Sequence, residues 1–322
     1  MATDPFRWPH GANIAVVFNM AWEFWDDKLG TIDDKEPAAP KIPATAPYAR
    51  GMRWVYDHAY AETGGMQRLL AIWARHGIAA SCCVDGLAVS HYPDMARRIR
   101  DAGHELYIQG WDHSSLWAMT VAQQADAIDK CLAVFRKTLG IESAGFSSAH
   151  GNLTPETTDI CAARGFKYIV GMKNSDVPFV IRVGDRRLVA MTSYDFSDFG
   201  TFGAKPSAPR EVLDQWRDAF DGMYEEGQEG QPKLLVYGCH PFLARVHRTR
   251  PLEELIRYVK SRPGVWIATR AEVADWVLRK YPNMALSDLY PEATVSDRVY
   301  GLSLGLGGEK AREKAMKYRR KE

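Results

Sequence analysis

The sequence predicts an α/β fold in which a mostly parallel sheet forms a barrel. Short apolar runs alternate with segments of helical periodicity along most of the chain, as in sheets built from strand–helix units. Seven or eight repeats of this unit suit a closed barrel better than an open sheet. Because catalytic residues of such barrels lie at the carboxyl ends of the strands, those positions are the ones to search for function.

Eight apolar runs have the length and composition of buried strands. They cover residues 13–19, 78–84, 105–109, 143–148, 167–172, 187–192, 234–239 and 264–269. Helical patterns are predicted at 64–77, 92–103, 120–140, 154–165, 208–227, 250–264 and 269–281. In "TPETTDICAARG", Thr154 is a candidate N-cap with proline at the first helical position.

A single catalytic domain is expected over residues 1–282, with two segments outside the strand–helix rhythm. Residues 25–63 predict a long loop, and loops of that length are usually functional or disordered. Its aromatic residues favour a packed lid or a subunit contact. Residues 283–322 follow the last strong helix and predict an extension that contacts a neighbouring subunit. Both segments favour a homo-oligomer, either a dimer or a tetramer.

Composition bounds the location and the partners. The 322 residues are 46% hydrophobic and 25% charged, with a formal net charge of +1. This balance predicts a globular protein without a general field for nucleic acid or an anionic membrane. No apolar stretch reaches the roughly 20 residues that a membrane span needs, and the amino terminus does not resemble a signal peptide. Five cysteines without framework spacing favour a reducing compartment, so we expect a cytoplasmic protein.

Glu23 is the first candidate at a strand end. It follows the first predicted strand and is flanked by Trp22, Phe24 and Trp25. A carboxylate among large rings loses hydration, which raises its pKa and suits it to general-base catalysis. Together with Trp111, these tryptophans would also suit ring stacking on a substrate. The alternative is an exposed glutamate on a loop.

Polar residues also follow the third and fourth predicted strands. Gln109, Asp112 and His113 lie in "QGWDHSS", and His150 lies in a polar turn before a helix. We expect Gln109, His113 and His150 to contact a substrate, and His113 is also a candidate acid. A structural histidine and ordinary capping of the turn are the alternatives.

His240 is the strongest histidine candidate. It directly follows the apolar strand at 234–239 and precedes Pro241, a placement that core packing explains poorly. We expect it to act as an acid or a base. Arg245, in the basic segment that follows, is a candidate for binding an anionic group, unless that segment is only solvated. Asp198 and Asp195 follow another strand without an assigned role.

These residues, in this order, resemble the polysaccharide deacetylase family, and more closely its small-molecule branch, which includes metal-independent allantoinases. The resemblance runs from about Trp8 to Trp276 and includes "WPHGANIAVVFNMAWE", "GFSSAHGNLTPETTDICAARGFKY" and "DAFDGMYEEGQEGQPKLLVYGCHPF". It implies a distorted (β/α)7 barrel, in agreement with the strand count.

The departures from that family concern its metal site. Metal-dependent members have a catalytic base followed by an acidic metal ligand after strand 1, and His-x-x-x-His after strand 3. Here Glu23 stands at the base position, Phe24 at the ligand position and Gln109 at the first histidine, with His113 kept; the family's arginine after strand 4 is Ser147. Two of three expected ligands are absent, so the resemblance implies no metal and no other cofactor.

Three functions fit this pattern. In the first, the protein is a metal-independent hydrolase of a C–N bond in a small amide, imide or cyclic amide, with Glu23 as general base, His240 as general acid, and Gln109 with His113 at the carbonyl oxygen. In the second, the same pocket catalyses an isomerase, lyase or C–C hydrolase reaction. In the third, the protein is a non-catalytic family member. A metal site rebuilt with other ligands stays open, and the substrate is not determined.

Overall fold

The computed structural model describes residues 5–24, 42–43, 45–48, 50–193, 196–203 and 207–290. All ten strands of this part of the chain belong to one sheet. They are β1 (Ile14–Trp22), β2 (Ser81–Asp85), β3 (Glu105–Gly110), β4 (Gly145–Phe146), β5 (Tyr168–Val170), β6 (Phe179–Val183), β7 (Arg186–Met191), β8 (Phe196–Ser197), β9 (Lys233–Cys239) and β10 (Val265–Ile267). Their order is β6-β7-β5-β4-β3-β2-β1-β9-β8, and β10 pairs with β1.

The sheet curls into an incomplete parallel barrel. Only the β6–β7 hairpin is antiparallel among the described strands. Strand β1 has β9 along one edge, whereas its other edge is shared by β10 at residues 14–16 and β2 at residues 19–22. No pairing in the described residues joins β6 to β8, so the ring stays open there. The predicted fold class is confirmed, and each of the eight predicted runs overlaps an observed strand.

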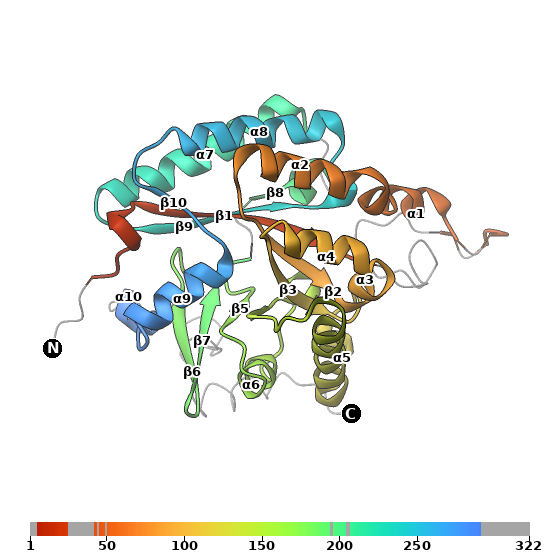
Figure 1. The fold of residues 1–322 in the computed structure, drawn as a ribbon, viewed down its shortest axis with the longest axis horizontal. Helices are drawn as coiled ribbons and strands as arrows, with labels where there is room; N and C mark the ends of the chain where they lie inside the picture. Colours follow the sequence, from red (N-terminus) through yellow and green to blue (C-terminus); the bar gives the residue numbers. More distant parts are fainter. Residues whose placement is uncertain are drawn as a thin grey trace.

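Helices pack around the sheet (Figure 1). They are α1 (Met52–His58), α2 (Met66–His76), α3 (Gly86–His91), α4 (Pro93–Asp101), α5 (Val121–Leu139), α6 (Thr157–Ala163), α7 (Pro209–Gln228), α8 (Val246–Lys260), α9 (Arg270–Lys280) and α10 (Leu286–Leu289). Their ends follow the local chemistry: a capping box at Thr120 begins α5, and left-handed Gly140 ends it. In the view of Figure 1, α7, α8 and α2 lie above β9 and β1, and α9 lies beside β6 and β7.

Alternation along β1 divides the interior into two apolar clusters. Phe18 and its neighbours of the same parity pack with residues of the outer helices. Residues of the other parity, such as Val17, pack with Trp8 and with Val273 and Val277 of α9. The start of α9 is also tied into the barrel, because the fully buried Arg270 donates to Asn19 of β1 and to the carbonyl of Thr192 beyond β7.

Some predictions of local structure were wrong. The loop expected at 25–63 contains α1 and a π-helical turn at Ala61–Gly65, and 25–41 lie outside the described residues. Thr154 does not begin its helix, because residues 155–156 form a turn and α6 starts at Thr157. The part of the extension described here is packed, since Val180 of β6 donates its N–H to the carbonyl of Met284.

The short strands β6 and β8 and the helix α3 had no predicted counterpart. None of the described helices has the length and apolarity required to cross a bilayer.

Candidate active site

A polar cavity of about 410 Å³ lies at the carboxyl ends of the strands. Its lining comes from the ends of six strands and the segments that follow them, together with Ser197 in β8 and Phe199 beyond it. The lining residues are Glu23, Gln109, His113, Ser147, Ser148, His150, Gly151, Gly171, Lys173, Ser193, Ser197, Phe199 and His240. This is the end of the barrel where catalysis was expected, and the volume suits a small molecule.

Five of the predicted site residues line this cavity together. Glu23 comes from β1, Gln109 and His113 from β3, His150 from the segment after β4, and His240 from β9. Residues separated by more than 200 positions therefore share one wall, as the strand-end argument requires.

Three predicted site residues that the structure describes are not part of this lining. Trp22 is fully buried and donates its indole N–H to Glu62 at 2.8 Å, so it belongs to the core. Trp111 packs against the backbone of Gly86. The Arg245 guanidinium lies over the Tyr60 ring, 3.5 Å from its centroid, and therefore does not reach the cavity. Trp25 lies outside the described residues.

His240 joins two carboxylates in a buried chain. Its Nδ1 is 2.6 Å from Oδ1 of Asp198, and its backbone N–H donates to Oδ2 of the same residue at 2.8 Å. Its Nε2 is 3.3 Å from Oε1 of Glu23. Burial disfavours the imidazolium, but Asp198 and then Glu23 outweigh it and raise the pKa of His240 to about 10. His240 is therefore protonated at neutral pH and able to donate a proton.

The predicted rise in the pKa of Glu23 was wrong. Burial does act in that direction, but His113 and His240 together overcome it and lower the pKa of Glu23 to about 2. The two Nε2 atoms approach the same oxygen, Oε1, at 3.7 and 3.3 Å. Glu23 is thus a carboxylate in an ion pair, and its strength as a base depends on the proton of its partner.

His113 lies between Glu23 and a second buried carboxylate, Asp85. Its Nδ1 is 3.7 Å from Oδ2 of Asp85, which also accepts the Phe24 N–H at 2.9 Å. Burial raises the pKa of Asp85 to about 6, although His113 favours the ionised form. The site therefore contains a row of alternating carboxylates and imidazoles, each next to the one that follows. Its members are Asp198, His240, Glu23, His113 and Asp85.

The sequence analysis did not identify two members of this row, Asp85 and Asp198, as functional residues. Asp85 directly follows the strand predicted at 78–84 and precedes a glycine, so a search of every strand end for carboxylates would have found it. Asp198 was noticed after a strand but not paired with His240, because residues 42 positions apart meet only through the pairing of β8 with β9.

Other lining groups offer hydrogen bonds to a polar ligand. Oε1 of Gln109 and Oγ of Ser148 are buried without a hydrogen-bond partner among the described residues. His150 has a left-handed backbone (φ 58°), which is uncommon outside glycine, and its ring contacts His113 with a centroid separation of 4.7 Å. Burial lowers the pKa of His150, and the charge of His113 lowers it further. This residue is a neutral donor or acceptor at pH 7.

The donor set does not suit a bound metal ion. The described residues contain no group of three or more His, Cys, Asp or Glu side chains arranged to hold one. At the two positions where the family resemblance places ligands, Phe24 stacks on the His91 ring and Gln109 offers a neutral amide. No step of the chemistry below is assigned to a metal.

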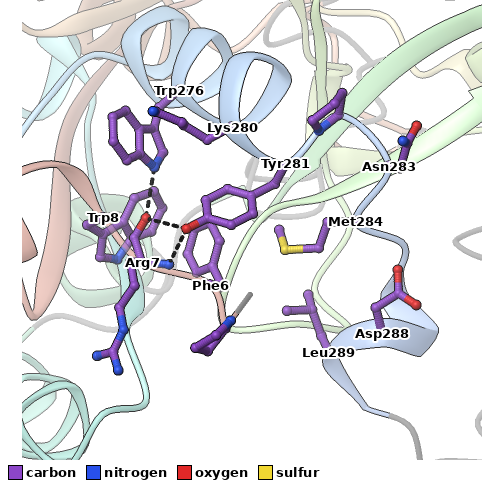
Figure 2. A pocket seen from close by; sticks show the side chains of 12 residues that line it. Phe6, Arg7, Trp8, Trp276, Lys280, Tyr281, Asn283, Met284, Asp288 and Leu289 are labelled. Atoms are coloured by element: carbon purple, nitrogen blue, oxygen red, sulfur yellow. Dashed lines mark hydrogen bonds between the residues drawn. The ribbon is translucent and has the colours of Figure 1, made fainter. Parts of the chain in front are cut away.

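A larger cavity of about 700 Å³ lies at the other end of the molecule, between the amino-terminal segment and the end of α9 (Figure 2). Phe6, Trp8, Trp276 and Tyr281 form much of its wall. Tyr281 and Trp276 make hydrogen bonds to the backbone of Arg7, and the figure shows these groups holding that segment. The described lining of this larger cavity lacks the array of histidines and carboxylates found at the smaller cavity, so we take the smaller cavity as the candidate active site.

Residues 52–169 match the family model described as polysaccharide deacetylase. A putative polysaccharide deacetylase of Schizosaccharomyces pombe is 24% identical over 324 residues, covering 88% of this chain and 95% of that protein.

Among solved structures, a probable polysaccharide deacetylase of Pseudomonas aeruginosa has a TM-score of 0.74 at 23% identity, covering 85% of this chain and 94% of that one. PuuE allantoinase also has a TM-score of 0.74 at 23% identity, with 87% and 96% covered. At such identities the two structures establish the fold.

Proposed function

We propose that the chain, whose residues 52–169 match the polysaccharide deacetylase model, hydrolyses a non-peptide carbon–nitrogen bond in a small molecule, without a bound metal ion. The observation that carries this proposal is the buried chain from Asp198 through His240 to Glu23, which opens into a polar cavity. It supplies a proton donor and a proton acceptor in contact with each other. The allantoinase among the similar structures is a precedent for such a small-molecule substrate.

Attack by water begins the proposed reaction. Glu23 accepts a proton from water as the water oxygen bonds to the carbonyl carbon of the substrate. Charge then develops on the carbonyl oxygen, and donors placed in advance lower the free energy of that state. The Gln109 side-chain NH₂ and the His113 ring are the candidate donors to that oxygen. The unpartnered Oε1 of Gln109 can accept a hydrogen bond from an N–H group of the substrate.

Collapse of the intermediate breaks the carbon–nitrogen bond. His240 transfers its proton to the leaving nitrogen, and the products are an acid and an amine. As His240 loses its positive charge, the pKa of Glu23 rises, because the nearest cation has gone. The low pKa of Glu23 in the resting enzyme therefore does not prevent its action as a base in a coupled proton transfer.

The test is metal analysis combined with activity on a panel of small linear and cyclic amides, imides and ureides. Protein purified without added metal is assayed before and after treatment with a chelator. We expect metal below stoichiometry and turnover that survives chelation. A tightly held equivalent of metal, with activity lost on its removal, would overturn the metal-independent mechanism. Turnover only of substrates with an acidic C–H bond would instead favour an isomerase or lyase.

A further inference from the structure

We infer that Asp85 is a positioning residue of this site, whose carboxylate holds the His113 ring toward Glu23 and fixes the backbone immediately after Glu23. The inference rests on the proposed function for its effect on turnover, but its effect on His113 is independent of any substrate. Asp85 is not among the residues that line the cavity. It acts through Phe24, which follows the lining residue Glu23, and through His113, which is part of the lining.

One carboxylate oxygen makes both contacts. Oδ2 of Asp85 accepts the Phe24 N–H at 2.9 Å and lies 3.7 Å from Nδ1 of His113. The opposite ring nitrogen, Nε2, lies 3.7 Å from Oε1 of Glu23. Asp85 thus touches the residue after the proposed base and the ring that faces that base. A shift of its side chain would move both sides of the reacting centre.

The backbone around Asp85 is tied to the His113 segment. Leu87 donates its N–H to the carbonyl of Trp111 at 2.8 Å. A Cβ on Gly86 would lie 2.8 Å from the Trp111 ring and 3.1 Å from Sγ of Cys131, so only glycine fits there without a rearrangement. These contacts fix the segment after β2 against the segment after β3. The separation of Asp85 and His113 is therefore set by packed backbone.

Folding alone does not account for a carboxylate at this position. The Asp85 side chain is fully buried, and its Oδ1 has no hydrogen-bond partner among the described residues. Burying such a group opposes folding, so its presence here favours a use in the site. Asp198 makes the equivalent contact with the other histidine: it contacts Nδ1 of His240, while Nε2 of that ring faces Glu23. By analogy, Asp85 orients the His113 ring toward Glu23. An ionised Asp85 likewise favours the imidazolium form of His113, in which Nδ1–H faces Asp85 and Nε2–H faces Glu23 or the substrate oxygen.

The charge on Asp85 is sensitive to pH. Its pKa is raised to about 6, chiefly by burial, against the favourable effects of His113 and the Phe24 N–H. The other titratable groups near it are Glu23, which raises its pKa, and the thiols of Cys83 and Cys131. Both thiols have pKa values raised well above the usual range by burial, so they stay neutral near pH 6. Loss of the Asp85 charge below about pH 6 is expected to weaken the hold on His113.

The experiment compares Asp85→Asn with Glu105→Gln in the full-length protein. Asparagine keeps the shape and an oxygen that can accept the Phe24 N–H, but it removes the charge. Glu105 is a buried carboxylate at the start of β3, remote from the cavity lining, and controls for the loss of a buried charge. Nitrogen-15 NMR of the histidine rings follows His113 from pH 4 to 9, with His113→Gln to assign its signal. In parallel, kcat/KM on the best substrate of the amide panel is measured across the same range.

We expect Asp85→Asn to lower the titration midpoint of His113 by about one pH unit or more, and Glu105→Gln to leave it unchanged. Wild-type kcat/KM should fall as the pH drops through about 6. Asp85→Asn should lose about 10- to 100-fold in kcat/KM at pH 8, mostly in kcat, and should lack that acid limb. An unchanged His113 midpoint, or full activity in Asp85→Asn, would overturn the inference.

Two further measurements keep the test decisive. If Asp85→Asn does not fold, as judged by circular dichroism, Asp85→Ser supplies a smaller neutral acceptor for the same titration. If the wild type turns over no amide, the proposed function fails. The shift in the His113 midpoint then still decides whether Asp85 positions that ring.

Discussion

Two buried carboxylate networks occupy opposite ends of the sheet, and they differ in how far their oxygens are satisfied. At the start of β3, Oε1 of Glu105 accepts from the Tyr168 hydroxyl at 2.6 Å, and Oε2 accepts from Ser81 and from the Ala271 N–H at 2.7 and 3.1 Å. At the carboxyl end, Oδ1 of Asp85 has no partner among the described residues, and Oε1 of Glu23 faces two histidine rings at longer range.

The difference separates a structural network from a reactive one. Fixed hydrogen bonds to both oxygens of Glu105 tie β2, β3, β5 and α9 together. The Glu23 network instead keeps hydrogen-bonding capacity and a movable proton beside a cavity. Burial alone does not distinguish the two, because both carboxylates are removed from water.

Neutralising each carboxylate gives the largest expected contrast. Glu23→Gln should lower kcat/KM by about 10³-fold, because it removes the proposed base and the partner of His240. Glu105→Gln should keep kcat/KM within about twofold but cost about 1–3 kcal/mol of unfolding free energy, since an amide NH₂ would face a donor. Steady-state kinetics and urea unfolding measure the two effects. Equal losses of activity in both variants would contradict the division between the networks.

The Asp198–His240 contact sharpens the comparison through pH. His240 has a pKa of about 10 in the folded protein, against an ordinary value of 6.5. Between these values the folded protein holds a proton that the unfolded chain releases. The stability it contributes is therefore complete below pH 6.5 and is lost as the pH rises through 10.

Asp198→Asn should make this pH dependence of the unfolding free energy shallower. The same variant should move the alkaline limb of kcat/KM, which lies near pH 10 in the wild type, down by about one unit or more. Chemical unfolding and kinetics from pH 6 to 11 check both statements. An alkaline limb that stays in place would mean that Asp198 does not hold the His240 proton.

Two glycines give the smallest expected effects, one beside each network. A Cβ on Gly65 would lie 1.8 Å from the carbonyl oxygen of Pro241, which follows His240, whereas one on Gly145 would lie 1.9 Å from the Tyr168 ring. Both alanine variants should lose about 1–3 kcal/mol of stability through overpacking. Only Gly65→Ala should also reduce kcat, by about tenfold, because Pro241 shifts His240. A Gly145→Ala variant with the same loss of kcat would indicate that the networks are coupled.

Local sequence reasoning located most strands and the catalytic end, but it misjudged the electrostatics. Short continuous apolar runs predicted β1 to β5, β7, β9 and β10, because a strand buried on both faces is apolar at successive positions. The short β8 lacks such a pattern and was missed. Glu23 was given a raised pKa because its sequence neighbours are aromatic, whereas the groups that lower its pKa, His113 and His240, come from distant strands.

The aromatic residues show the same limit. Trp22 was predicted to stack on a substrate because it adjoins Glu23, but successive residues of a strand face opposite ways, and Trp22 packs into the helix-covered core. Asp85 was overlooked because one aspartate before a glycine carries little information without its partner. Its importance follows from a contact with His113, 28 positions further along the chain.

The sequence by itself determined the α/β barrel class, the family resemblance and the strand ends that carry Glu23, His113 and His240. These are properties of local patterns, in which periodicity and the residue after each strand can be read directly. Only the tertiary structure decided the order Asp198, His240, Glu23, His113, Asp85, and with it the low pKa of Glu23 and the high pKa of His240. Charge interactions depend on distance in space, which the folded sheet sets by bringing the ends of β1, β2, β3 and β9 together with Asp198 beyond β8.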